Sequence, residues 1–140
     1  VLTEGPKRIL TPSYHIFDMY QGHMGARQVE TYTETRLIRE GDVELPNLHI
    51  SASEKDGELL ITLVNLDDRH PADSRIALCG TKAAEASAST LGGNSGAFNT
   101  FDAPDTVTPR ALEVQCKEKG AVLKVKLPPA SVTAITVKQA

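Results

Sequence analysis

Closely spaced acidic side chains are the residues of this sequence that could carry out chemistry. Two carboxyl groups held close together, one of them with a raised pKa, can act as a general acid and a nucleophile. Asp67 and Asp68 form the tightest acidic pair. Neighbours at the end of a strand point in opposite directions, and the following residues 69–71 indicate a turn. We therefore interpret this pair as turn residues rather than as an acid and a nucleophile.

The other acidic candidates are weaker. Glu30 and Glu34 could share one face of a strand, as in any solvated strand. Asp102 and Asp105 flank Pro104 in an irregular segment, where they more simply cap turns. We therefore expect no catalytic residue in this chain.

Metal and cofactor chemistry has no better candidates. The histidines show no metal-ligand spacing, and they are His15, His23, His49 and His70. A surface hydrogen bond between His15 and Asp18 is the simpler expectation for the first of them. There is no nucleophile elbow or phosphate loop, and Gly92-Gly93 is only a flexible turn. We expect neither a metal site nor a cofactor.

Cys79 and Cys116 are the only cysteines. They could form one disulfide, but a single pair implies no disulfide framework. Cys116 continues the alternation of Leu112 and Val114, which predicts that it points into a core. We expect two buried free thiols, and nothing nearby would lower a thiol pKa.

The composition is that of one ordinary globular domain. The 140 residues are 40% hydrophobic and 24% charged, with a net charge of −3. Lysine and arginine are scattered along the chain, which argues against a nucleic-acid partner. No apolar run approaches the roughly 20 residues that cross a bilayer, so we expect no membrane partner.

The elements that would position these residues fall into two parts. Thr11 and Pro12 are a typical helix start, and aromatic and Met side chains then recur every three or four residues along one helix face. These are Tyr14, Phe17, Tyr20 and Met24. The chain contains no second helix to cover them, so we expect their packing partner to lie in a missing domain. The sequence starts at Val1, in a segment that already has the pattern of a structured one. This start indicates a fragment or a processed product.

From Ala26 onward the apolar residues alternate with a period of two. Asp56-Gly57 is a strong hairpin signal, and the long segment 92–109 has no strand periodicity. Because Phe98 and Phe101 lie in that segment, we expect it to be docked on a surface. Many short alternating strands predict an antiparallel sandwich or barrel. The predicted strands are 29–38, 48–53, 59–66, 75–79, 83–91, 112–117, 123–127 and 131–138.

Several segments resemble one enzyme family. Residues 9–20 resemble the last barrel helix of retaining α-L-arabinofuranosidases of glycoside hydrolase family 51, and residues 2–5 resemble the loop before it. Residues 50–53 and 63–67 resemble the first sandwich hairpin of that family. Residues 99–109 are similar to a specific loop of the family, and residues 127–133 to its closing strand.

This resemblance implies a larger parent enzyme. In the family, a (β/α)₈ barrel carries two catalytic glutamates upstream of the last helix, and a jelly-roll-like sandwich follows. The family sandwich also takes a strand from the enzyme's N-terminus, whose absence would leave an edge exposed. We therefore expect an all-β, antiparallel, jelly-roll-like sandwich (residues 26–140), preceded by the last loop and α-helix of the barrel (residues 1–25).

The implied function is structural support within a hydrolase. The parent would remove terminal arabinofuranosyl residues from arabinan or arabinoxylan, and this segment alone would be inactive. Its partners would be the barrel of the same polypeptide, arabinose-containing poly- or oligosaccharides through the parent, and further copies, because the resemblance implies oligomers. The expected domain interface comprises Tyr14, Phe17, Tyr20, Phe98, Asn99 and Phe101. The compartment is cytoplasmic or secreted, the former favoured for a bacterial source.

Two alternatives remain open. A carbohydrate-binding module would stack aromatic rings on sugars, but the chain lacks Trp and has only Tyr32, Phe98 and Phe101 outside the helix. An oligomerisation or interaction domain is the other alternative, and it is compatible with the family resemblance.

Overall fold

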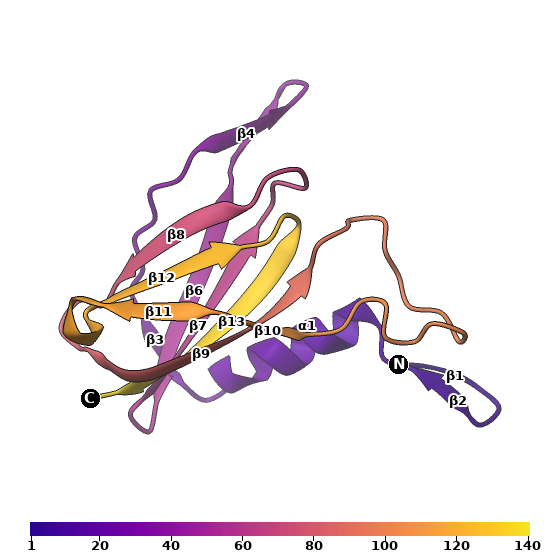
Figure 1. The fold of residues 1–140 in the computed structure, drawn as a ribbon, viewed down its shortest axis with the longest axis horizontal. Helices are drawn as coiled ribbons and strands as arrows, with labels where there is room; N and C mark the ends of the chain where they lie inside the picture. Colours follow the sequence, from indigo (N-terminus) through magenta and orange to yellow (C-terminus); the bar gives the residue numbers. More distant parts are fainter.

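Two antiparallel β-sheets stack on each other, with one helix against the larger sheet (Figure 1). The computed structural model describes all residues, 1–140. The larger sheet has the strand order β10-β9-β13-β7-β6-β3 and the smaller one β11-β12-β8. Their strands are β3 (Arg27–Val29), β6 (Leu48–Lys55), β7 (Glu58–Asn65), β8 (Ala72–Ala77), β9 (Ala83–Gly92), β10 (Arg110–Leu112), β11 (Val114–Lys117), β12 (Val122–Leu127) and β13 (Ser131–Gln139).

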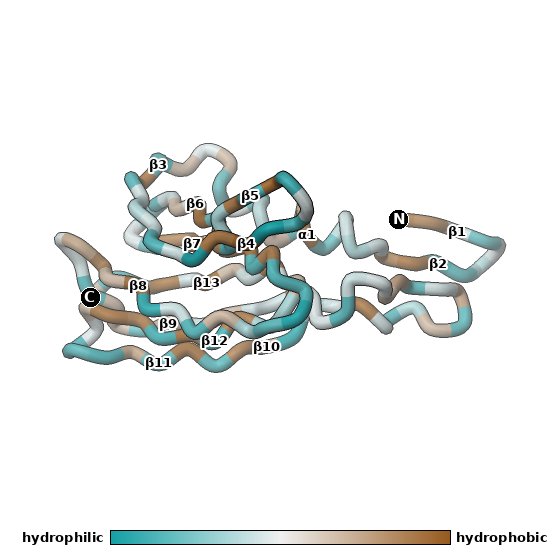
Figure 2. The backbone as a smooth tube through the Cα atoms, turned by 90° about the horizontal axis from the view of Figure 1, so that it is seen from above, coloured by the Kyte–Doolittle hydropathy of each residue, from teal (hydrophilic) through white to brown (hydrophobic).

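Two separate ribbons and three helical segments complete the chain. The ribbon β1 (Leu2–Glu4) with β2 (Lys7–Ile9) extends beyond one end of the sheets (Figure 2). A second ribbon, β4 (Leu37–Glu40) with β5 (Val43–Pro46), projects from another side (Figure 1). The helical segments are α1 (Pro12–Tyr20) and two short 3₁₀ turns, η1 (Gln21–His23) and η2 (Glu118–Gly120).

The core lies between the two sheets and follows directly from the period-two alternation. Leu59, Ile61 and Leu63 of β7 belong to one buried cluster with Leu123 and other residues of β12 and β13. Because successive side chains of a strand face opposite sides, every second residue of these strands enters the core. Removing such a side chain from water contributes about 1.5–3 kcal/mol to the free energy that stabilises the folded state. The predicted antiparallel sandwich architecture is therefore confirmed.

The predicted hairpin at Asp56-Gly57 is also confirmed. It joins β6 to β7, which pair along their whole length from Lys55–Glu58 to Leu48–Asn65. Both turn residues have positive φ, 54° for Asp56 and 79° for Gly57. A two-residue turn of this kind matches the right-handed twist of the strands that it connects.

One predicted strand, 112–117, is divided between the two sheets. Residues 110–112 pair with β9 in the larger sheet, whereas residues 114–117 pair with β12 in the smaller one. The chain crosses from one sheet to the other at Glu113. Leu112 and Val114 both pack against the core, so the alternation continues through the bend, which the sequence pattern alone does not reveal.

The predicted strand 29–38 is largely wrong. The structure has strand only at 27–29 and from Leu37 onward, with no regular structure at residues 30–36. β3 pairs with β6 over three residues, and beyond them no neighbouring strand is available. Tyr32, in the middle of this segment, is 85% exposed. Strand-forming side chains need a pleated surface to pack against, and residues 30–36 have none.

The cysteine prediction is half correct. Both thiols are free, but both are exposed. Cys116 lies opposite Leu123 in the register, so it is on the core-facing side of the smaller sheet as predicted. However, β11 is the edge strand of that sheet, and the larger sheet does not cover Cys116.

The predicted helix start is confirmed, and the side of the helix that packs on the sheet carries a histidine. Thr11 caps the helix by accepting a hydrogen bond from the Tyr14 N–H at 3.3 Å. The helix contacts β9 and β13 and buries His15. A surface hydrogen bond from His15 to Asp18 is therefore wrong, and the Asp18 carboxylate instead accepts from Gln21. Phe17 is 78% exposed and Tyr14 is 40% exposed, so nothing in this chain covers this part of the aromatic stripe, whereas Tyr20 is half-buried.

The core geometry predicts different effects for two directly opposed residues. Leu123→Ala should lower the free energy of unfolding by about 2–5 kcal/mol, because Leu123 is fully buried. The matched control Cys116→Ala should change it by less than about 0.5 kcal/mol. Urea unfolding of both variants measures this, and equal effects of the two substitutions would contradict the described core.

Candidate domain interface

The acidic pair Asp67-Asp68 lies in the connection between β7 and β8, and its two carboxylates are not equivalent. The Asp67 carboxylate accepts hydrogen bonds from the backbone N–H groups of Arg69 and His70 at 2.8 and 2.9 Å. It also forms an ion pair with Arg36 and contacts the His70 ring at 3.1 Å. Asp68 is exposed and lies 3.8 Å from the Arg69 side chain.

These contacts make Asp67 a structural anion. The backbone N–H of Arg69, then the Arg36 guanidinium, hold the pKa of the Asp67 carboxyl far below its ordinary value. A general acid needs the opposite shift, and the oxygens of Asp67 are already occupied. The interpretation of this pair as turn residues therefore agrees with its surroundings.

Two buried asparagines extend this network and were not identified from the sequence. Asn47 and Asn65 are each 1% exposed. The Asp67 N–H donates to the Asn47 side-chain oxygen at 2.9 Å. The Asn65 amide donates to the carbonyls of His70 and Pro128 at 3.1 and 2.9 Å. An Asn that ends an apolar strand, as Asn65 does, was the only available signal.

The long segment 92–109 is docked on the N-terminal part of the chain, as expected. The Asn99 amide group donates to the carbonyls of Leu10 and Val107, both at 2.8 Å. Its side-chain oxygen accepts from the Val107 N–H at 2.6 Å. Lys7 and Asp102 add an exposed ion pair at 3.6 Å. One side chain, Asn99, therefore both folds this loop and attaches it to the residue that precedes the Thr11 helix cap.

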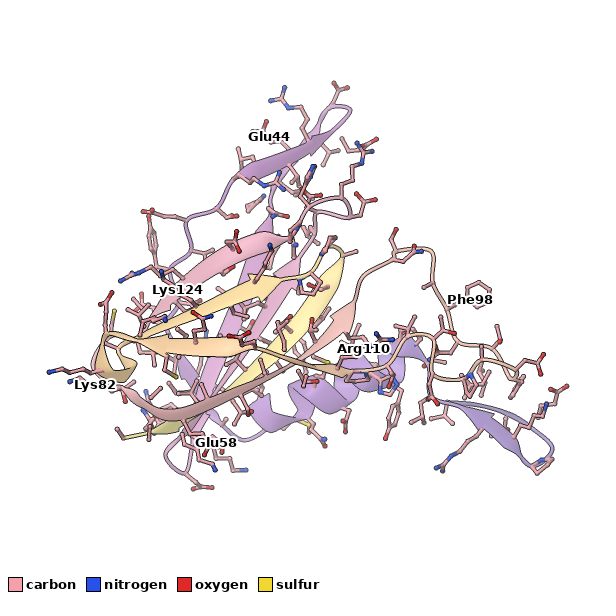
Figure 3. All side chains as sticks on the ribbon, viewed as in Figure 1. Glu44, Glu58, Lys82, Phe98, Arg110 and Lys124 are labelled. Atoms are coloured by element: carbon pink, nitrogen blue, oxygen red, sulfur yellow. The ribbon has the colours of Figure 1, made fainter.

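The other expected interface residues divide into exposed and half-buried ones. Tyr14, Phe17 and Phe98 are exposed, and we call these three the aromatic face. Phe98 projects from the loop into solvent (Figure 3) and is 68% exposed, so it does not anchor the loop on the helix. Phe101 and Tyr20 are half-buried, and the Tyr20 ring lies edge-on to the His23 ring at 5.6 Å.

The aromatic residues outside the helix do not form a single platform for a sugar. Tyr32 lies between β3 and β4, and its hydroxyl donates to Glu34 at 3.1 Å. Phe98 lies in the loop after β9, and that loop is on the opposite side of the sheets from the connection between β3 and β4 (Figure 1). Stacking on a pyranose needs rings on one surface, and these two rings lie on different surfaces.

No group of three or more His, Cys, Asp or Glu side chains lies close enough together to hold a metal ion. None of the helical segments has the length and apolar character needed to cross a membrane.

By its fold the chain is an antiparallel β-sandwich domain with one helix against the larger sheet. The family model described as "Alpha-L-arabinofuranosidase C-terminal domain" matches residues 1–131. The chain therefore belongs to the family of C-terminal domains of α-L-arabinofuranosidases.

Individual relatives agree with this assignment. The chain is 30% identical over 142 residues to an intracellular exo-α-L-arabinofuranosidase of Bacteroides ovatus, covering 99% of this chain but 27% of the relative. The GH51 arabinofuranosidase of Xanthomonas axonopodis pv. citri superposes with a TM-score of 0.89 at 30% identity, over 97% of this chain and 28% of that one. An α-L-arabinofuranosidase of Thermotoga maritima, solved as an arabinose complex, gives a TM-score of 0.79 at 25% identity, over 99% and 31%. The chain thus corresponds to less than a third of each of these proteins.

The Asp67 network predicts a specific acid sensitivity. Since the pKa of Asp67 in the folded state lies below its ordinary value of 3.8, the unfolded chain binds the proton first, and stability falls as the pH drops through that value. Asp67→Asn should lower the urea midpoint at pH 7 and should weaken the loss of stability on acidification. The control Asp68→Asn should do neither. Indistinguishable urea midpoints for the two variants from pH 7 to pH 2.5 would contradict a structural role of Asp67.

Proposed function

We propose that this chain is the C-terminal accessory sandwich of a retaining α-L-arabinofuranosidase and that it braces the catalytic barrel. The parent would release terminal, non-reducing arabinofuranosyl residues from arabinan or arabinoxylan by double displacement. Its acid/base and nucleophilic glutamates would lie in the barrel, upstream of this segment. The family match over residues 1–131 carries this proposal.

The same proposal assigns the parts of the chain. Residues 1–25 are the last loop and helix of the barrel, and residues 26–140 are a jelly-roll-like sandwich. The two faces of α1 support this division, because His15 is buried while Phe17 on the other side is exposed. A helix that lies between a sheet and a second domain needs packing on both of these faces.

The aromatic face is the proposed contact with the barrel. Large exposed apolar side chains that lie together typically mark an interaction surface. The hydrogen bond from Asn99 to Leu10 places the loop beside the start of the helix, which brings the segments that carry Phe98 and Tyr14 to one end of the molecule (Figure 1). Tyr20, Asn99 and Phe101 would support this contact from beneath, because they are half-buried.

We further propose that the parent is cytoplasmic, supported by the description of the Bacteroides ovatus relative as intracellular. Arabinose-containing poly- or oligosaccharides would bind the parent enzyme in the active site of its barrel and would not bind this domain. The wide separation of Tyr32 from Phe98 argues against the alternative of a carbohydrate-binding module.

The bracing role predicts an effect that depends on context. In the full-length parent, Phe17→Ala and Phe98→Ala should lower the melting temperature, because burying a Phe contributes up to about 3–5 kcal/mol relative to Ala. In the isolated 140-residue chain the same variants should be neutral, since both side chains are exposed there. Tyr32→Ala, which removes an exposed ring outside the aromatic face, should be neutral in both proteins. Differential scanning calorimetry tests this, and neutral Phe variants in the parent would refute the contact.

A second role, as an oligomerisation or interaction domain, is favoured by the ribbon β4–β5. Its residues Leu37, Val43 and Leu45 are all exposed, and an isolated two-stranded ribbon is marginally stable in water. Val43 and Leu45 lie on one face of the ribbon. The double variant V43K/L45K should therefore shift the parent towards monomer in analytical ultracentrifugation. An unchanged sedimentation coefficient would exclude the ribbon from the subunit contact.

A further inference from the structure

The end of the helical segment is held to the sheet by one imidazole. His23, the last residue of η1, places its Nδ1 atom 2.7 Å from the Ser53 hydroxyl and its Nε2 atom 3.0 Å from the Thr62 hydroxyl. Ser53 lies on β6 and Thr62 on β7, and both are buried. In β7, Thr62 faces away from the core residues Ile61 and Leu63. The His23 ring therefore sits on the outer face of the larger sheet.

These two contacts are the only hydrogen bonds between residues 12–24 and the sheets. Gly22 adds a tight apolar contact, since a Cβ added there would come within 2.8 Å of the Leu60 side chain. At the other end, Asn99 binds Leu10. His23 therefore supplies, at the C-terminal end, all the hydrogen bonds that join the helical segment to the sheets.

The hydrogen bonds fit a neutral ring in one tautomer. The Thr62 hydroxyl donates to the Ser51 carbonyl at 3.4 Å, so it is free to accept from Nε2–H. Nδ1 then accepts the hydroxyl proton of Ser53. Adding a proton at Nδ1 turns this acceptor into a donor, and the Ser53 hydroxyl has no other hydrogen-bond partner in the structure. Burial also lowers the pKa of His23, because it disfavours the charged form.

No carboxylate forms a hydrogen bond or an ion pair with the His23 ring. On the helical side, Asp18 binds Gln21, the Tyr20 ring lies edge-on, and His15 is two turns away. On β3 and β6, Arg27 and Glu54 form an ion pair with each other, and Lys55 is a further cation. The remaining charged groups on this side are Asp56 in the β6–β7 turn and Glu58 on β7, which line the same hollow as Gly22 and Ser53. On β13, Lys138 pairs with Glu85. None of these groups bonds to the His23 ring.

We propose that His23 is an acid-sensitive latch: its neutral ring holds the α1–η1 segment on the sheet, and protonation releases that segment. In the docked state the ring binds a proton less readily than in the undocked state. The undocked segment therefore takes up the proton as the pH falls below about 6.5, the ordinary value for histidine, and docking weakens in that range. Acid would then also loosen the contact with the barrel, and this consequence rests on the proposed function. The latch itself does not rest on it.

Hydrogen exchange in the 140-residue chain tests the latch without the barrel. After correction for intrinsic rates, the protection of residues 12–24 should fall from pH 7.5 to pH 5.5. The fall cannot exceed about tenfold, the limit set by an undocked imidazole that titrates near 6.5. In His23→Gln, which cannot titrate, protection should not depend on pH. The control His49→Gln, which alters an exposed histidine of β6, should keep the wild-type response.

The imidazole nitrogen signals of the unmodified chain provide a second readout that does not depend on the folding of a variant. They should show the Nε2–H tautomer and a His23 titration below the ordinary value, and Ser53→Ala should raise that midpoint by removing the hydroxyl donor. A His23 that titrates at or above its ordinary value would overturn the latch. So would pH-independent protection in the wild type, or a pH response that persists in His23→Gln. None of these results depends on whether the chain braces a barrel.

Discussion

The buried hydrogen bonds of Asn65 couple the two sheets. Asn65 ends β7 in the larger sheet, and its amide binds the Pro128 carbonyl just after β12 of the smaller sheet. The chain then turns and enters β13, where Ser131 pairs with Asn65. Because a buried amide without partners is costly, this contact holds the connection between the sheets in one position. The central pairing of β13 with β7, and the core beneath it, depend on that position.

Asp67 extends the same constraint to the neighbouring turns. Its backbone carbonyl accepts from Ala130 at 2.8 Å, and its carboxylate holds the turn after β7 as well as Arg36, next to the projecting ribbon. A carboxylate used in this way is unavailable for catalysis. The strongest acidic feature of the sequence therefore serves the architecture, which agrees with a domain whose contribution to hydrolysis is support.

The helix connects this architecture to the proposed function. One side of α1 and η1 rests on the sheet through His15 and His23, and the other side leaves Phe17 uncovered. Asn99 attaches the long loop at the beginning of the same segment. The position of the aromatic face relative to the sandwich is therefore determined by contacts at both ends of one short helix. Movement of either end would change the surface that the proposed function assigns to the contact with a barrel.

The sequence by itself determined the local features of this protein. The alternation in 59–66 and 123–127 predicted the core strands, Asp56-Gly57 the hairpin, and Thr11-Pro12 the helix start, because each depends on backbone preferences of a few neighbouring residues. Other features depend on tertiary contacts. These are the exposure of Cys116, the loss of strand at residues 30–36, the sheet crossing at Glu113 and the burial of His15, Asn47 and Asn65. Each of these depends on which distant segment covers a side chain or pairs with a backbone. A local sequence pattern does not specify that distant segment.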